Sequence, residues 1–317
     1  MNILITGAAG YIGSVLIDHL FTNHDGMFNK ITAVDNLLYN QTTLTNYCHR
    51  DEFEFYKLDV RDYDKMLPLV KQADVIIPLA CIVGMPACKK YPELTLSTNQ
   101  EAVQWLTKVT RSDQKIIFPT TNSGYGIGQE NIFCTEETPL TPISLYGVTK
   151  VEAEKALLEN GNAVTLRLAT VFGMSPRMRL DLLVNDFTYK AYKDKYIVLF
   201  ESHFKRNFIH IRDIARTFVF VIRNFDKMKG QTYNVGLSSA NISKKELCES
   251  IKKFIPEFYI AESEINKDPD QRNYIVSNEK LEALGWAPEF TLEAGIAELL
   301  KAYPIIDNVN NKNFTNL

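Results

Sequence analysis

The stretch Asn2-Ile-Leu-Ile-Thr-Gly-Ala-Ala-Gly-Tyr-Ile-Gly13, near the start of the chain, decides the fold class. Its apolar half, residues 3–6, predicts a buried strand, and the residues that follow Gly10 predict a helix. Gly7 permits a tight turn, Gly10 lets the backbone approach a pyrophosphate, and Gly13 lets the helix pack closely on the strand. Because the free N–H groups at the start of such a helix favour phosphate, the stretch predicts a dinucleotide site.

Five more short apolar runs follow and alternate with longer amphipathic segments. They occupy residues 31–35, 53–58, 75–79, 116–119 and 164–168. Strands that are apolar throughout and alternate with helices are typical of an α/β fold with a doubly wound parallel sheet, here in the Rossmann order 3-2-1-4-5-6. The pattern becomes irregular after residue 167. We therefore expect a cofactor-binding Rossmann domain over residues 1–167 and a smaller α+β substrate-binding region over 168–317, with segments around 206–225 returning to the first domain.

An acidic residue at the end of the second strand indicates which dinucleotide is bound. Asp35 stands 22 residues after Gly13, where a carboxylate can accept hydrogen bonds from the adenosine ribose. It would repel a 2′-phosphate, and Asn36 and the two leucines after it bring no positive charge, so we expect tightly bound NAD rather than NADP. The other expected cofactor contacts come from the glycine motif and from the ends of the second, third and fourth strands: Tyr11, Ile12, Asn36, Asp59, Val60, Leu79, Ala80 and Cys81.

Tyr146 and Lys150 form a candidate catalytic pair. They are four residues apart in a segment that we expect to be helical, so their side chains share one face. A free tyrosine titrates near about pH 10, but a neighbouring ammonium and a positive nicotinamide ring favour the phenolate. Such a phenolate can take a proton from a hydroxyl while hydride passes to NAD. Lys150 would also hold the nicotinamide ribose, which makes both residues cofactor contacts.

The segment before this pair carries a resemblance to a known family. Residues 118–126 read Phe-Pro-Thr-Thr-Asn-Ser-Gly-Tyr-Gly and place Tyr125 21 residues before Tyr146. In this the chain resembles the extended short-chain dehydrogenase/reductases, the NAD-dependent epimerase/dehydratases of nucleotide sugars, with their SS(S/T)xxxYG and YxxxK segments. The resemblance covers nearly the whole chain. It implies a nucleotide-sugar substrate and a catalytic role for Thr121 beside Tyr146 and Lys150.

The second half of the chain resembles the family as well. Residues 167–173 are similar to its RxxNxxG strand, with Thr170 where Asn is usual. Arg206, and Arg272 within residues 268–274, stand where family arginines bind the nucleotide diphosphate, and the planar fork of arginine suits phosphate. The substrate residues expected from the resemblance and from nearby polar side chains are Thr121, Asn122, Ser123, Thr170, Arg177, Arg179, Asn185, Arg206 and Arg272.

Departures from the family pattern bear on the type of reaction. Family 4,6-dehydratases carry an Asp-Glu pair directly after the catalytic Thr, whereas this chain has Asn122 and Ser123, which cannot do that acid–base work. The reaction that remains is NAD-dependent oxidation of a ring hydroxyl, at C4. Gly124, where a bulkier residue is common, would enlarge the space beside the sugar.

Short stretches point to a substrate within this class. Residues 122–128, 169–173, 175–179 and 182–186 resemble bacterial surface-polysaccharide enzymes that act on GDP-linked heptose, which implies a C4 dehydrogenase of capsule synthesis. Two alternatives stay open. The keto sugar can be reduced again in place, which makes a 4-epimerase, or the fold can serve as a non-catalytic NAD sensor or scaffold.

Composition limits the remaining classes. Of 317 residues, 45% are hydrophobic and 23% charged, and the net charge is −3, so we expect neither nucleic-acid nor membrane binding. No basic segment precedes the first strand, which predicts a cytoplasmic protein. The five cysteines form no CxxC pair, so no metal site is expected. The resemblance implies a homodimer formed by the helix with Tyr146 and a second helix at 100–110.

Overall fold

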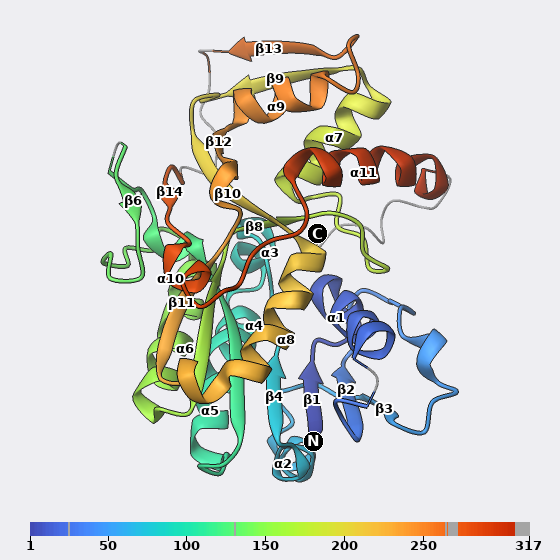
Figure 1. Cartoon of the computed structure of the whole chain (residues 1–317), viewed down its shortest axis with the longest axis vertical. Helices are drawn as coiled ribbons and strands as arrows, with labels where there is room; N and C mark the ends of the chain where they lie inside the picture. Colours follow the sequence, from blue (N-terminus) through green and yellow to red (C-terminus); the bar gives the residue numbers. More distant parts are fainter. Residues whose placement is uncertain (25, 130, 264, 266–271, 308–317) are drawn as a thin grey trace.

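Seven parallel strands form the central sheet in the computed structural model (Figure 1), in the order β3-β2-β1-β4-β5-β7-β11. The doubly wound α/β fold and its strand order are confirmed, and β11 adds a seventh strand beside β7 that sequence analysis missed. The strands are β1 (Asn2–Thr6), β2 (Lys30–Asp35), β3 (Phe53–Lys57), β4 (Val75–Pro78), β5 (Lys115–Thr121), β7 (Ala163–Leu168) and β11 (Gln231–Val235). The structure describes residues 1–24, 26–129, 131–263, 265 and 272–307.

The strands are apolar on both faces because helices cover both faces. Ile3 and Ile5 of β1 belong to one hydrophobic core and Leu4, between them, to the other. Burial of each such side chain contributes about 1.5–3 kcal/mol. The first core includes α1 (Tyr11–Asn23) and α8 (Ile211–Met228), and the second includes α2 (Tyr63–Gln72), α5 (Ala102–Val109) and α6 (Leu145–Asn160).

A second group of elements lies above the carboxyl ends of the sheet strands (Figure 1). One small sheet has the order β12-β10-β8, and another pairs β13 with β9. These elements are β8 (Thr170–Phe172), β9 (Tyr196–Phe200), β10 (Lys205–His210), β12 (Asn241–Ser243), β13 (Tyr259–Ser263), α7 (Leu183–Lys193), α9 (Lys244–Lys252) and α11 (Leu292–Ile306).

Part of the second half of the chain lies with the Rossmann sheet. Helix α8 packs against α1, and β11 pairs with β7 along its whole length. The division into two domains with a boundary at residue 167 stays a proposal. Residues 268–271, which precede Arg272, and the C-terminal residues 308–317 lie outside the described residues.

Short elements shape the rim of the sheet. Helices α3 (Met85–Lys90) and α4 (Pro92–Leu96) follow β4, and a π-helical turn at Ser97–Glu101 joins α4 to α5. The other short elements are η1 (Thr45–Tyr47), η3 (Asn122–Tyr125), β6 (Phe133–Cys134), η4 (Ser238–Ala240), β14 (Ile275–Val276) and α10 (Glu279–Glu282). Within the described ranges, every helix is too short or too polar to cross a bilayer.

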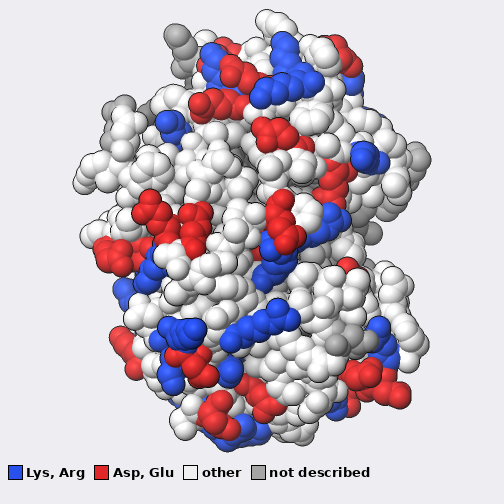
Figure 2. Space-filling view, in the orientation of Figure 1, with Lys and Arg blue, Asp and Glu red and all other residues white. Residues whose placement is uncertain are grey.

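Surface charge is mixed on the face seen in Figure 2. Acidic and basic side chains are interspersed over this face without a large area of one sign. This face therefore offers no extended basic surface of the kind that binds nucleic acid. Among the residues that the structure describes, no three His, Cys, Asp or Glu side chains are grouped to hold a metal ion.

Candidate active site

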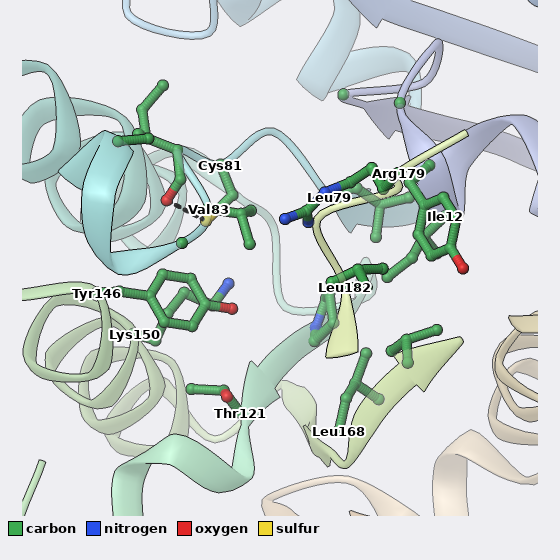
Figure 3. A pocket seen from close by; sticks show the side chains of 18 of the residues that line it. Ile12, Leu79, Cys81, Val83, Thr121, Tyr146, Lys150, Leu168, Arg179 and Leu182 are labelled. Atoms are coloured by element: carbon green, nitrogen blue, oxygen red, sulfur yellow. Dashed lines mark hydrogen bonds between the residues drawn. The ribbon is translucent and has the colours of Figure 1, made fainter. Parts of the chain in front are cut away.

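A cleft of about 1110 Å³ opens at the carboxyl ends of the sheet strands, where doubly wound sheets bind their ligands (Figure 3). Every residue predicted to contact the cofactor lines it. These residues are Gly7, Gly10, Tyr11, Ile12, Gly13, Asp35, Asn36, Asp59, Val60, Leu79, Ala80, Cys81, Tyr146 and Lys150.

The glycine loop forms one wall of the cleft and admits no larger residues. Gly7 has a φ of +64°, and a Cβ atom there would lie 2.5 Å from the backbone nitrogen of Ala80. A Cβ atom on Gly13 would lie 2.5 Å from the carbonyl oxygen of Ala8. Helix α1 begins after Gly10 without a side-chain cap or an acidic residue in its first turn. Its N–H groups therefore remain available to a phosphate, and the loop fits the pyrophosphate of a dinucleotide.

Asp35, at the end of β2, lines the same cleft. It is 7% exposed and accepts hydrogen bonds from the backbone nitrogens of Ala9 (3.0 Å) and Leu37 (2.8 Å). Burial raises the pKa of Asp35, while these bonds and the charge of Arg177 oppose the rise. Sequence analysis found no positive charge near Asp35 because it considered only the adjacent residues in the chain. The fold brings Arg177 there from a distant segment.

A second carboxylate, that of Asp59, lines the same cleft. Asp59 accepts a hydrogen bond from the side chain of Asn36 at 3.2 Å and forms an ion pair with Arg61 at 2.8 Å. The ion pair lowers the pKa of Asp59 to about 2. Asp59 is therefore ionised and held in place at neutral pH.

The catalytic pair comes from the start of α6. The Ser144 hydroxyl accepts a hydrogen bond from the nitrogen of Gly147 at 3.1 Å, which fixes where the helix begins. Tyr146 and Lys150 then point into the cleft from successive turns, and Thr121 at the end of β5 faces them (Figure 3). The structure therefore brings together the three residues predicted to be catalytic.

The electrostatics of the pair differ from expectation. Burial raises the pKa of Tyr146 well above its usual value, and the charges that oppose this rise belong to Arg179 and Arg272. From the sequence, Lys150 was expected to be the positive charge that lowers the pKa of Tyr146. Burial lowers the pKa of Lys150, whose ammonium lies 3.7 Å from the centroid of the Phe118 ring. Arginines from distant segments therefore add to the positive charge near Tyr146.

The predicted substrate residues divide into two groups. Those that line the cleft are Thr121, Ser123, Thr170, Arg177, Arg179, Arg206 and Arg272. Arg272 donates a hydrogen bond to the Ser123 hydroxyl, which is itself 3.0 Å from the Thr121 hydroxyl. This bond places Arg272 beside the catalytic residues.

Asn122 and Asn185 are not among the residues that line the cleft. The Asn122 side chain is 1% exposed and lies behind the cleft wall. Asn185 is fully buried, accepts from the nitrogen of Gly173 (3.0 Å), and donates to the Tyr11 hydroxyl (3.2 Å) and the Arg179 carbonyl (2.9 Å). Asn185 thus positions the segment that carries Arg179.

The expectation for Gly124 is wrong. A Cβ atom on this residue would lie 3.1 Å from Val151 and 3.2 Å from Leu140, and Gly124 does not line the cleft. The absence of a side chain there allows η3 to pack against α6. It does not enlarge the space beside a substrate.

Sequence analysis missed a residue that holds the cleft floor. Asn99 accepts a hydrogen bond from the nitrogen of Ile82 at 2.8 Å and donates to its carbonyl oxygen at 2.9 Å. These bonds fix the loop after β4, which includes Cys81. The π-helical turn aims Asn99 at this loop, and no local sequence pattern signals such a turn.

The fold and the site together define a Rossmann enzyme of the short-chain dehydrogenase/reductase type. The sequence model of the NAD dependent epimerase/dehydratase family matches residues 3–236. The chain belongs to this family, and its cofactor is NAD.

Known relatives span the length of the chain. The low-salt glycan biosynthesis protein Agl12 of Haloferax volcanii is 28% identical over 313 residues, with 96% of this chain and 98% of that protein covered. UDP-glucuronic acid decarboxylase 6 of Arabidopsis thaliana is 27% identical, with 93% and 87% covered. The structure of UDP-glucuronic acid 4-epimerase from Bacillus cereus has a TM-score of 0.84 at 23% identity, with 96% and 100% covered. This last similarity shows the fold alone.

Proposed function

We propose that the protein is a cytoplasmic enzyme that oxidises the C4 hydroxyl of a nucleotide-linked sugar, GDP-heptose, in surface-polysaccharide synthesis. The observation that carries the proposal is the arrangement of Tyr146, Lys150 and Thr121 opposite the glycine loop. A hydroxyl-bearing carbon between these two walls meets a base on one side and the cofactor on the other.

The chain supplies the proton transfer and the positioning. Bound NAD supplies the hydride acceptor, and its positive ring favours the Tyr146 phenolate. Thr121 and Tyr146 bind the sugar hydroxyl, and the phenolate removes the O–H proton. The electron pair of the C4–H bond leaves as hydride while the C=O bond forms, so the products are a keto sugar, NADH and protonated tyrosine. Lys150 holds the nicotinamide ribose.

Two arginines support a nucleotide diphosphate as part of the substrate. Arg206 is 4% exposed, lies 5.6 Å from the centroid of the Tyr274 ring and lines the cleft. Arg272 lines the cleft beside Ser123. Relatives described as UDP-glucuronic acid decarboxylases support the nucleotide-sugar class. The resemblance of residues 175–179 and the other short stretches supports GDP-heptose within that class.

The type of reaction follows from the residues after Thr121. A dehydratase needs an acid and a base there, whereas Asn122 is buried behind the cleft and Ser123 has only a hydroxyl. Oxidation with release of the keto sugar is the function we propose. The second candidate is a 4-epimerase with recycled NAD, which is favoured by a Bacillus subtilis relative that is described as a UDP-glucose epimerase and is 30% identical over 251 residues.

Mass spectrometry of the purified protein incubated with GDP-heptose tests the proposal, after denaturation to release bound cofactor. A product lighter by two hydrogen atoms, with NADH recovered, supports the dehydrogenase. An unchanged mass with a new stereochemistry by NMR supports the epimerase, and loss of water contradicts both. Parallel incubations with other nucleotide sugars test which nucleotide base and which sugar the protein accepts.

The Tyr146→Phe variant separates an enzyme from a sensor or scaffold. It removes the proton acceptor and leaves the ring in place, so we expect turnover to fall by about 100-fold or more. NAD content, measured after denaturation, should stay at the wild-type level. A variant that keeps wild-type turnover would rule out the proposed base.

We also propose a homodimer, as the resemblance implies. Leu145 and Val148 on α6 and Leu96 on α4 are apolar and more than a third exposed. Since α4 and α6 lie in contact, these side chains form a candidate interface on the outer side of the catalytic helix.

A further inference from the structure

The segment of residues 173–181 leads from β8 toward α7 and is bonded to the start of α1. The Ser175 hydroxyl donates to the Tyr11 carbonyl (2.8 Å) and lies 3.1 Å from the Ser14 hydroxyl. The Tyr11 hydroxyl donates to the Gly173 carbonyl at 2.7 Å. All three bonds are buried. They hold this segment over the end of α1 that faces the cleft.

Two arginines of the segment enter the cleft at different points. The Arg177 guanidinium carbon lies 4.9 Å from the centroid of the Tyr39 ring, and its charge acts on Asp35, at the adenosine-ribose end. Arg179 extends between the glycine-loop wall and the catalytic pair (Figure 3), and its charge acts on Tyr146, at the nicotinamide-ribose end. The two guanidinium groups thus bracket the space between the ribose sites. In a dinucleotide that space holds the pyrophosphate.

We propose that Arg177 and Arg179 bind the pyrophosphate of NAD, from the side opposite the start of α1, and do not bind the substrate diphosphate. The helix end gives the phosphates N–H groups on one side, and the two guanidinium groups face them from the other. Because Nε and Nη2 of Arg179 donate to Asp181, this arginine would reach a phosphate with its Nη1. Arg206 and Arg272 remain for the substrate. The inference rests on NAD as the cofactor and is independent of which sugar is oxidised.

Burial of the two charges supports a bound anion. Arg177 is 4% exposed and Arg179 is 7% exposed, although Arg179 has an ion pair with Asp181 at 2.5 Å. Burial lowers the pKa of Arg177, and the neighbouring charge of Arg179 lowers it further. A diphosphate between them would relieve this repulsion, because it brings two negative charges next to the two guanidinium groups.

The same bonds have a consequence for cofactor exchange. NAD held between α1 and residues 173–181 leaves only when the Ser175 and Tyr11 bonds open. Asn185 strengthens this closure because it binds both the Tyr11 hydroxyl and the Arg179 carbonyl. We therefore expect bound NAD to exchange slowly with NAD in solution.

Exchange of bound NAD for isotopically labelled NAD tests the inference on the purified protein. In Arg177→Met and in Arg179→Met, we expect exchange to become about 10- to 100-fold faster, the effect of losing one charge-assisted contact. The affinity for ADP-ribose should fall by a similar factor and that for adenosine by less than about twofold. The affinity for GDP should be unchanged. Wild-type exchange together with weakened GDP binding would overturn the inference.

Arg206→Met is the matched control and should behave in the opposite way, with wild-type NAD exchange and weakened GDP binding. Should either methionine variant unfold, Arg177→Lys and Arg179→Lys replace them, because lysine keeps the charge and loses the fork. These variants should exchange NAD severalfold faster than wild type. Folded lysine variants with unchanged exchange and unchanged ADP-ribose affinity would also overturn the inference.

Discussion

Lys150 holds a positive charge inside the protein. Its side chain is 4% exposed, and its ammonium lies 3.7 Å from the centroid of the Phe118 ring. A cation over a phenyl ring gains about 0.5–2 kcal/mol, whereas removing an ion from water costs several kcal/mol. Burial accordingly lowers the pKa of Lys150. The ligand-free protein is thus destabilised by a group that its function requires.

The Lys150→Met variant should be more stable than the ligand-free wild type by about 1–2 kcal/mol, and it should lose turnover. The folded-state pKa of Lys150 lies below the unfolded value of about 10.4. The unfolded state therefore binds more protons in this window, and wild-type stability rises with pH. The advantage of the variant should shrink between about pH 7 and about pH 9.5. Urea unfolding at both pH values measures the difference in free energy of unfolding between variant and wild type. A difference that does not change with pH would contradict a lowered pKa of Lys150.

The pH dependence of the reaction follows from Tyr146. Burial raises the pKa of this tyrosine, and the forward reaction needs its phenolate. Sugar oxidation in a single turnover should therefore become faster from about pH 6 to about pH 9, while reduction of the keto sugar should change little, because the tyrosine that it needs stays protonated over this range. Stopped-flow absorbance of NADH measures both directions. Parallel pH trends in the two directions would contradict this role.

At the residue scale, local patterns could be predicted and long-range neighbours could not. The glycines, Asp35, Tyr146 and Lys150 follow from spacing within one loop or one helix, and the structure places them along the cleft. The contact of Arg177 with this site depends on how a distant segment crosses the sheet. Arg177 can be read from the sequence, but the residues that surround it in the fold cannot.

At the scale of elements, one buried ion pair fixes the catalytic helix on the sheet. Glu154 of α6 accepts a hydrogen bond from Arg167 of β7 at 2.7 Å, and both side chains are under 10% exposed. Arg167 also donates to the Tyr125 hydroxyl at 3.0 Å, which in turn donates to Asn234 of β11 at 2.7 Å. This network links α6, η3, β7 and β11. It therefore sets the position from which α6 presents its catalytic residues.

Removal of one partner of this pair should be costly. Glu154→Leu leaves the Arg167 charge buried, and we expect a loss of about 3–5 kcal/mol in the free energy of unfolding. The double variant with Arg167→Leu should recover part of this loss, because no uncompensated charge remains. Urea unfolding of both single variants and the double variant measures the coupling. Additive losses would show that the two side chains act independently.

Strands were predicted correctly where helices cover both faces of the sheet. The six predicted strands are short apolar runs, and the helices on both faces of the sheet explain why they lack polar residues. Strand β11 reads Gln-Thr-Tyr-Asn-Val, and the buried Asn234 side chain within it is bonded to the Tyr125 hydroxyl and the Ser277 carbonyl. Such a strand resembles a loop in composition. The helix expected at 100–110 is α5 (Ala102–Val109), preceded by the π-helical turn.

At the scale of the whole molecule, the site lies between the two groups of elements. The Rossmann sheet supplies the glycine loop and the catalytic helix, and the upper group supplies Arg206 from β10 (Figure 1). The sequence predicted each group from its own pattern. Their relative placement arises from buried contacts such as the Tyr11–Gly173 bond, which joins residues 162 positions apart. No periodicity in the sequence encodes such a contact.

The proposed dimer can be tested through the outer side of α6. Val148 is 40% exposed, lies between Tyr146 and Lys150 in sequence, and belongs with Leu145 and Leu96 to the proposed interface. Size-exclusion chromatography with light scattering should give twice the chain mass of 36.2 kDa. Val148→Asp should shift the protein to monomer, because a charge buried in an apolar interface is strongly unfavourable. Val198→Asp, on β9 and also 40% exposed, is the control and should stay dimeric. A wild-type protein that is monomeric at every concentration would reject this interface.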